Sequence, residues 1–177
     1  MNYIPDIYSK RVLILGCGNV LFGDDGFGPE VCKHLTENHQ IPEDVGVEDC
    51  GTGVREILFD IRLSSQKIEE IIIVDAIDSG RRPGEIFEMN PDDLSPAKSD
   101  DFLIHALPTS NLLKELRDKC GIKVSILACQ ISHIPPQVKM GLSLPLKDGV
   151  KKAAQILAEK NFIIPSYIQN DTKLHSN

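Results

Sequence analysis

The sequence has no apolar run long enough to cross a bilayer. Its longest runs, such as 12–15 and 71–74, stop at four residues, whereas a spanning helix needs about 20. The first ten residues contain scattered polar and charged side chains and no apolar signal-peptide core. These absences predict a cytoplasmic protein with no membrane partner.

Paired cysteines and an excess of basic residues are also missing. The five cysteines are odd in number, widely spaced and without a C-x-x-C pair, which is typical of reduced thiols in the cytosol. Nineteen Lys and Arg residues face 26 Asp and Glu residues, giving a net charge of −7. Because an acidic surface repels phosphate backbones and anionic lipids, nucleic acid is not an expected partner.

Several common catalytic motifs are absent. The sequence contains no H-E-x-x-H, no zinc-spaced cysteine cluster, no G-x-S-x-G and no Gly-Lys-Ser/Thr phosphate loop. It also lacks repeats and low-complexity blocks. At 177 residues, with 41% apolar and 25% charged side chains, it has the size and composition of a globular domain. We expect one domain over 1–177, with its core in 10–160 and a frayed tail at 165–177.

Short apolar runs alternate with amphipathic segments along the chain. The predicted strands span 11–15, 46–49, 71–75, 84–90 and 123–129, and the predicted helices span 29–38, 54–63, 109–120 and 143–160. The unbroken Ile/Val run at 71–74 indicates a central strand covered on both faces, while the alternation in 84–90 indicates an edge strand. This order predicts a three-layer α/β/α sandwich whose five-stranded sheet is mostly parallel, with one antiparallel edge strand.

The first unusual cluster, 16–28, follows the first predicted strand, where α/β sheets bind ligands. It contains five glycines and the pair Asp24-Asp25. A dinucleotide loop would need glycine where Leu21 stands, and two carboxylates before a helix would repel a phosphate. Two interpretations stay open. Asp24 caps the helix with Asp25 in its first turn, or the loop is functional.

Two more clusters follow the second and third strands. The segment 49–53 favours a glycine turn in which Thr52 caps the next helix. Asp75 ends the central strand, where a charge is costly unless it is paired, hydrogen-bonded or bound to metal, so here a functional site is favoured. His105 becomes a ligand candidate if Asp25 and Asp75 lie nearby.

The remaining histidines and Cys17 are weaker candidates. His133 precedes two prolines and is a second ligand candidate, whereas His34, His39 and His175 are expected to be solvated. Cys17 lies between glycines with no histidine beside it in sequence, so we interpret it as a small loop residue rather than a nucleophile.

Taken in order, these motifs resemble the [NiFe]-hydrogenase maturation endopeptidase family over roughly residues 11–160. The matching segments are 15–21, 24–28, 49–52, 73–76, 83–86, His105 and 141–143. The stretch 81–84, Arg-Arg-Pro-Gly, is similar to the subgroup that serves deazaflavin-reducing hydrogenases of methanogens.

The resemblance implies a cytosolic protease that removes a C-terminal extension from a [NiFe]-hydrogenase large-subunit precursor after nickel insertion. It implies nickel contacts at Asp25, Asp75 and His105, with Asp25 and Asp75 as the catalytic pair. The nickel would arrive with the substrate, since two carboxylates and an imidazole without a thiolate bind it modestly. The residues expected to shape the substrate loops are Gly18, Asn19, Asp24, Asp49, Gly51 and Thr52. A monomer or weak dimer is expected.

Two mechanisms and two other functions stay open. Substrate nickel could polarise the attacking water, or the carboxylates could act as an acid–base pair that shares a proton. The chain could instead be a non-catalytic, nickel-sensing chaperone or carrier of the large subunit. A nucleotide-binding α/β domain is the third alternative.

Overall fold

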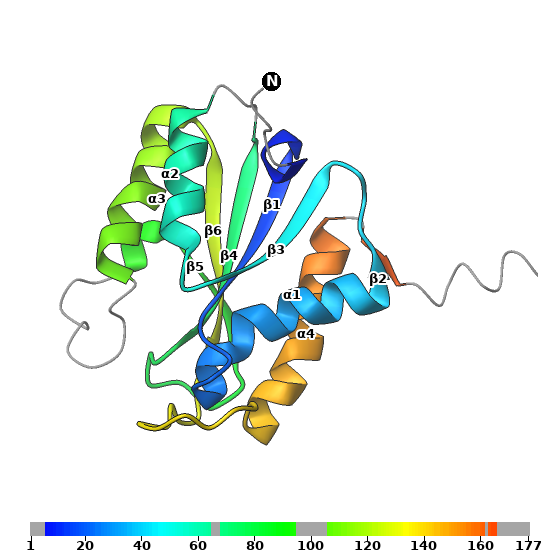
Figure 1. The fold of residues 1–177 in the computed structure, drawn as a ribbon, viewed down its shortest axis with the longest axis vertical. Helices are drawn as coiled ribbons and strands as arrows, with labels where there is room; N and C mark the ends of the chain where they lie inside the picture. The colour runs from blue at the N-terminus through cyan, green and yellow to red at the C-terminus, as the bar shows by residue number, and fades with distance from the viewer. Residues whose placement is uncertain (1–5, 65–67, 95–105, 162, 166–177) are drawn as a thin grey trace, which may run out of the picture.

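A five-stranded sheet forms the centre of the computed structural model, which describes residues 6–64, 68–94, 106–161 and 163–165. Its strand order is β3-β1-β4-β6-β5 (Figure 1). The first four of these strands run parallel, and β5 pairs antiparallel with β6 at one edge. The strand bounds are Val12–Cys17 for β1, Val45–Gly51 for β3, Glu70–Ile77 for β4, Ile86–Met89 for β5 and Lys123–Gln130 for β6. The predicted fold class is confirmed.

Two helices cover each face of this sheet (Figure 1). The helices α1 and α4 pack on one face, and α2 and α3 pack on the other. Their bounds are Phe27–Asn38 for α1, Val54–Leu63 for α2, Ala106–Cys120 for α3 and Leu144–Lys160 for α4. Within the described ranges, no helix combines the length and apolar character needed to cross a membrane.

The apolar runs of the central strands are buried on both faces. In β4, Ile72 and Val74 join the core under α1 and α4, whereas Ile71 and Ile73 join the core under α2 and α3. The same alternation divides β1. A strand with period 2 must be apolar at every position when both faces are covered, which explains the unbroken runs.

A second, two-stranded sheet was not predicted. β2, His39–Gln40, pairs antiparallel with β7, Ile164–Pro165. Each strand is too short to produce a periodic pattern. The rings of His34 and His39 are half-buried with centroids 6.0 Å apart, so the prediction that both are solvated is wrong. Burial and the neighbouring His39 lower the pKa of His34. His175 and the predicted tail from residue 166 onward lie outside the described residues.

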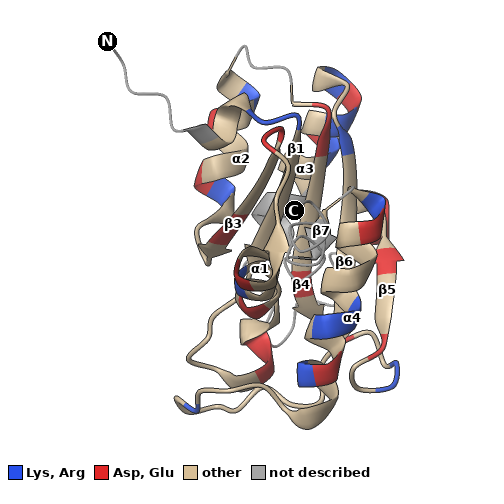
Figure 2. Ribbon diagram, turned by 90° about the vertical axis from the view of Figure 1, so that its right-hand side faces the viewer, with Lys and Arg blue, Asp and Glu red and all other residues tan. Residues whose placement is uncertain are grey.

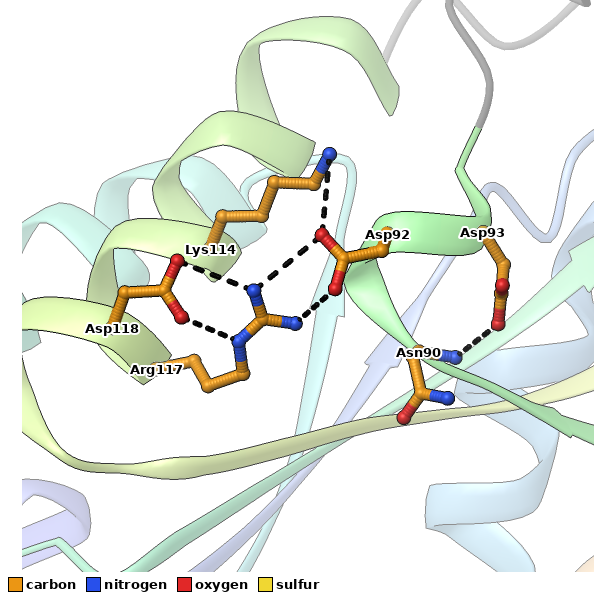
Figure 3. Close-up of polar contacts among 6 residues, drawn as sticks. All are labelled: Asn90, Asp92, Asp93, Lys114, Arg117 and Asp118. Atoms are coloured by element: carbon orange, nitrogen blue, oxygen red, sulfur yellow. Dashed lines mark hydrogen bonds and ion pairs between the residues drawn. The ribbon is translucent and has the colours of Figure 1, made fainter.

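A charged network joins the short helix η3, Pro91–Asp93, to the C-terminal half of α3 (Figure 3). Asp92 pairs with both Lys114 and Arg117, and Arg117 also bonds Asp118. These pairs are exposed, and such pairs contribute about 0–1 kcal/mol each. The network therefore sets the position of η3 more than it stabilises the fold. Residues 95–105, between η3 and α3, lie outside the described residues.

The N-terminus of α1 rests directly on the backbone of the central strands. A Cβ atom on Gly28 would lie 2.3 Å from the carbonyl oxygen of Cys17 and 2.4 Å from that of Val74. A Cβ on Gly16 would lie 2.5 Å from the Gly28 oxygen. These two glycines allow the helix to start at the carboxyl edge of β1 and β4.

We expect Gly28→Ala to lower the free energy of unfolding by about 2–3 kcal/mol, because the added methyl would overlap backbone that cannot move aside. Urea denaturation followed by circular dichroism measures this loss. Gly53→Ala is the matched control, since its Cβ would meet its nearest neighbour at 3.4 Å and its φ is −97°. The control should lower stability by no more than about 1 kcal/mol, the cost of alanine in place of glycine at the N-cap of α2. Equal effects at both positions would contradict the close-contact explanation.

Candidate active site

The loops after β1 and β3 are joined backbone to backbone at the carboxyl edge of the sheet. The amide of Gly18 donates to the carbonyl of Gly51 at 2.9 Å. Gly18 has φ +127°, and a Cβ there would lie 1.8 Å from the Asp25 carbonyl oxygen. Only glycine fits this position. The first loop therefore folds back tightly and brings Asp25 to the sheet edge.

Asp25 lies in a short helix, η2 (Gly23–Gly26), that precedes α1. The amide of Asn19 donates to both the Asp25 side chain, at 2.9 Å to Oδ2, and the Asp25 carbonyl, at 3.1 Å. The N-cap of α1 is Gly26, and no side chain caps the helix. The interpretation in which Asp24 caps α1 and Asp25 occupies its first turn is therefore wrong.

Asp75 lies two residues before the end of β4 and is partly buried. The pKa of this carboxyl is raised to about 8, mainly by burial and also by the negative charge of nearby Asp25, although a hydrogen bond from the Ala76 amide, at 2.8 Å, opposes the rise. The structure thus brings Asp25 and Asp75 within electrostatic reach. An acid of this kind is neutral over much of the physiological range and can donate a proton.

The third candidate, His105, lies outside the described residues, immediately before α3. Among the residues that the structure does describe, no group of three His, Cys, Asp or Glu side chains could hold a metal ion. The other ligand candidate, His133, is exposed.

Five of the six predicted loop residues line a shallow depression of about 210 Å³ next to the first loop. They are Gly18, Asn19, Asp49, Gly51 and Thr52. Asp49 accepts a hydrogen bond from the Gly51 amide at 2.9 Å, which closes the turn after β3. Thr52 is exposed and does not cap α2, whose N-cap is Gly53 without a side-chain bond. The capping interpretation of Thr52 is wrong.

The sixth predicted residue, Asp24, is buried, with 1% of its surface exposed. Its Oδ1 accepts a bond from the Ser143 amide at 2.7 Å. Its Oδ2 accepts from the amides of Ser132 and His133, at 2.8 and 3.1 Å, and from the Ser143 hydroxyl at 3.0 Å. Asp24 therefore shapes these loops from within the protein, because its four hydrogen bonds are internal and only 1% of its surface is exposed.

Ser143 occupies the N-cap position of α4, but its hydroxyl bonds Asp24 and makes no capping bond. Together Asp24 and Ser143 hold the segment 131–143 against the loop that carries Asp25. Cys17 lies in β1 and is buried, and burial raises the pKa of its thiol well above the ordinary value. A buried thiol of this kind is a poor nucleophile, which agrees with the prediction that Cys17 is not one, but its interpretation as a loop residue is wrong because it is the last residue of β1.

Gln130 organises the loop after β4, and sequence reasoning missed it. This buried residue ends β6, and its side-chain oxygen accepts bonds from the amides of Ser79 and Arg81 at 2.8 and 3.1 Å. Its side-chain nitrogen donates to Asp78 Oδ1 at 2.9 Å. A polar residue at the end of a buried strand was the available signal, the same one that pointed to Asp75.

Exposed apolar side chains border the first loop. Backbone bonds of 2.9 Å join Lys139 to Leu21 and to Gly23. The exposed side chains on these two paired segments are Val20, Leu21, Val138 and Met140, hereafter the apolar rim. Since Val20 follows Asn19 directly, the rim adjoins the depression beside Asp25. Exposed apolar groups gathered at a site favour a macromolecular ligand.

Comparisons with known proteins agree on one family. A family model described as hydrogenase maturation protease matches residues 29–160. A Methanocaldococcus jannaschii protein assigned as a hydrogenase maturation protease is 41% identical over 150 residues, covering 84% of this chain and 95% of that protein. The delta subunit of coenzyme F420 hydrogenase from Methanothermobacter thermautotrophicus is 33% identical over 157 residues, covering 86% and 96%.

A solved structure agrees as well. The crystal structure of a [NiFe] hydrogenase maturation protease from Thermococcus kodakarensis superposes with a TM-score of 0.64 at 28% identity, covering 87% of this chain and 95% of that one.

The raised pKa of Asp75 predicts a loss of stability with rising pH. Because the folded state holds this proton more tightly than the unfolded state, where the pKa is near 3.8, the stabilisation is present below about pH 4. It is lost as the pH rises through about 8. In metal-free protein, the free energy of unfolding of Asp75→Asn should therefore fall by at least about 2 kcal/mol less than that of the wild type as the pH rises from 4 to 9. Urea denaturation from pH 4 to 9 measures it, and parallel profiles for the two proteins would contradict the shift.

Asp24→Asn should lower the free energy of unfolding by about 2–4 kcal/mol. The substitution removes a buried carboxylate that accepts four hydrogen bonds. The NH2 group of the new side chain would face N–H and O–H groups and could not accept hydrogen bonds from them. Asp49→Asn is the control, because Asp49 is exposed and makes one bond to a neighbouring amide. Thermal and urea unfolding of both variants should separate them clearly. A loss at Asp24 no larger than at Asp49 would refute the role assigned to the buried carboxylate.

Proposed function

The chain belongs to the hydrogenase maturation protease family, and on that premise we propose that it removes the C-terminal extension of a [NiFe]-hydrogenase large-subunit precursor after nickel insertion. The observation that carries this proposal is the approach of Asp25 to Asp75 at the carboxyl edge of the sheet. Fold and family support peptide hydrolysis, and the paired acids give it a chemical basis.

The two acids differ in a way that suits general acid–base catalysis. Asp75 carries a proton up to about pH 8, mainly because of its burial, while Asp25 accepts a hydrogen bond from the Asn19 amide. In the proposed reaction, a water oxygen adds to the scissile carbonyl carbon as Asp25 accepts the water proton. Asp75 gives its proton to the amide nitrogen as the C–N bond breaks. In the alternative route both carboxylates are ionised and hold the substrate's nickel, which would polarise the attacking water.

Nickel belongs to the substrate in this proposal and serves to recognise a loaded precursor. Carboxylate oxygens from Asp25 and Asp75 and an imidazole nitrogen from His105 suit a borderline divalent ion. Since this set lacks a thiolate, its own affinity for nickel should be modest. The site would therefore respond to nickel that the precursor's thiolates already hold, and an empty precursor would not be cut.

The partner would be a large subunit that meets the apolar rim. The rim, with Met140 67% exposed and Val138 66% exposed, gives a protein substrate an apolar contact beside the carboxylates. The similarity to the coenzyme F420 hydrogenase delta subunit, together with Arg81 and Arg82, leads us to propose a deazaflavin-reducing hydrogenase as the substrate.

Intact-mass spectrometry of a large-subunit precursor incubated with the chain tests this function. We expect a nickel-loaded precursor to lose a C-terminal peptide and a nickel-free precursor to remain whole. Asp25→Asn and Asp75→Asn should each lower the rate at least about 100-fold, the usual contribution of a general acid or base. His105→Ala should abolish cleavage of the nickel-loaded form.

His133→Ala is the matched control, because this exposed histidine contributes only its backbone amide to the structure around Asp24. It should cleave at the wild-type rate. A precursor that binds but stays intact would favour the carrier function instead. Tight, stoichiometric zinc in the purified protein, required for cleavage, would contradict nickel as a substrate-borne recognition element.

A further inference from the structure

A groove of about 720 Å³ lies between the segment that follows the β4 loop and helix α4. One wall is the segment 82–86, which leads into β5, and the other is α4. Figure 2 shows α4 beside β5, with basic residues in the loop that leads into the strand. The α4 residues that line the groove are Lys152, Gln155, Ile156 and Glu159. Their spacing of three, four and seven places them on one face of the helix.

The shape of the groove suits an extended segment of chain. β5 is the last strand in the sheet order, so its outer edge has no strand partner among the described residues. Ile86 and Ile156, the latter 36% exposed, supply apolar contacts on opposite walls. An unpaired strand edge next to a helix is a common place for an extended peptide to bind.

The charges that line the groove are not balanced by internal pairing. Glu85 already pairs with Arg81 at 2.8 Å, which lowers the pKa of Glu85, and Glu159 accepts a bond from Gln155 at 2.9 Å. Arg82 and Lys152, by contrast, have no ion pair or side-chain hydrogen bond within the part of the chain that the structure describes. The bond from Gln155 leaves the charge of Glu159 unneutralised, and Arg82 also interacts with Glu85 and lowers its pKa. The groove therefore offers two cations to a ligand against one carboxylate without a cationic partner, in a protein whose net charge is −7.

The groove is fixed rigidly to the strand that carries Asp75. Gln130 holds the loop after β4 through its side chain, and its backbone bonds Gly84 and Glu85 at 2.9 Å each. A Cβ on Gly84 would lie 2.6 Å from the Pro145 carbonyl oxygen, so this loop also packs closely on the start of α4. One end of the groove therefore adjoins the loop that leaves the active-site edge.

We propose that this groove binds an extended, acidic segment of the large-subunit precursor. Arg82 and Lys152 pair with its carboxylates, and Ile86 and Ile156 contact its apolar side chains. This inference rests on the proposed function for the identity of the partner. The groove adds affinity at a distance from the reacting peptide bond, so its loss raises KM and leaves kcat unchanged.

The double variant Arg82→Glu/Lys152→Glu tests the groove directly. Isothermal titration calorimetry with nickel-free precursor measures binding without cleavage. We expect Kd to rise at least 10-fold, and KM for the nickel-loaded precursor to rise by a similar factor at unchanged kcat. The control is Lys33→Glu/Lys151→Glu, which changes the net charge equally at exposed positions on α1 and α4 outside the groove. Its Kd should change less than twofold.

The possible results distinguish failure of the groove proposal from failure of the proposed protease function. An unchanged Kd in the groove variant, or an equal rise in the control, overturns the proposal. A change in oligomeric state by sedimentation without a change in precursor binding would also overturn it, because the groove would then contact a second copy of the chain. If the wild-type protein binds the precursor through the groove but does not cut it, the result supports the groove as a binding site and contradicts the proposed protease function. Circular dichroism and thermal unfolding of both double variants confirm that each is folded.

Discussion

The contact that the rest of the site depends on is the one between the N-terminus of α1 and the backbone of β1 and β4. Gly28 and Gly16 bring helix and strands so close that no side chain fits between them. Since η2 leads directly into α1, this contact fixes where the first loop lies above the sheet edge. Asp25 reaches Asp75 only because the helix starts there.

The adjacent acids of the first loop, Asp24 and Asp25, lie in different surroundings and therefore have different roles. Asp24 turns inward and satisfies four donors from a segment more than 100 residues away, so its charge is fully compensated inside the protein. Asp25 turns toward the edge of the sheet and lies near another carboxyl. The inner acid thus anchors the segment 131–143, and the outer acid remains available for chemistry.

The carboxyl ends of β4 and β6 carry a candidate catalytic acid, Asp75, and a residue that supports the neighbouring loop, Gln130. Burial of Asp75 makes its ionised form costly, which retains a proton at neutral pH. The register of β4 and β6 places Asp75 opposite Ala128 and Gln130 opposite Ile77, two positions farther along, and Gln130 fixes the loop that leaves β4. The same loop then forms a wall of the groove, so the acid pair and the groove share one rigid support.

The sequence by itself determined the order of helices and strands, the mostly parallel sheet and the candidate site at Asp75, because apolar periodicity and the cost of a charge at a strand end are local properties. Only the tertiary structure decided the role of Asp24, the role of Gln130 and the pairing of β2 with β7. Each of these depends on hydrogen bonds between segments far apart in the chain, for which a single sequence carries no local signal. The groove likewise exists only because strand order places β5 at the edge, next to α4.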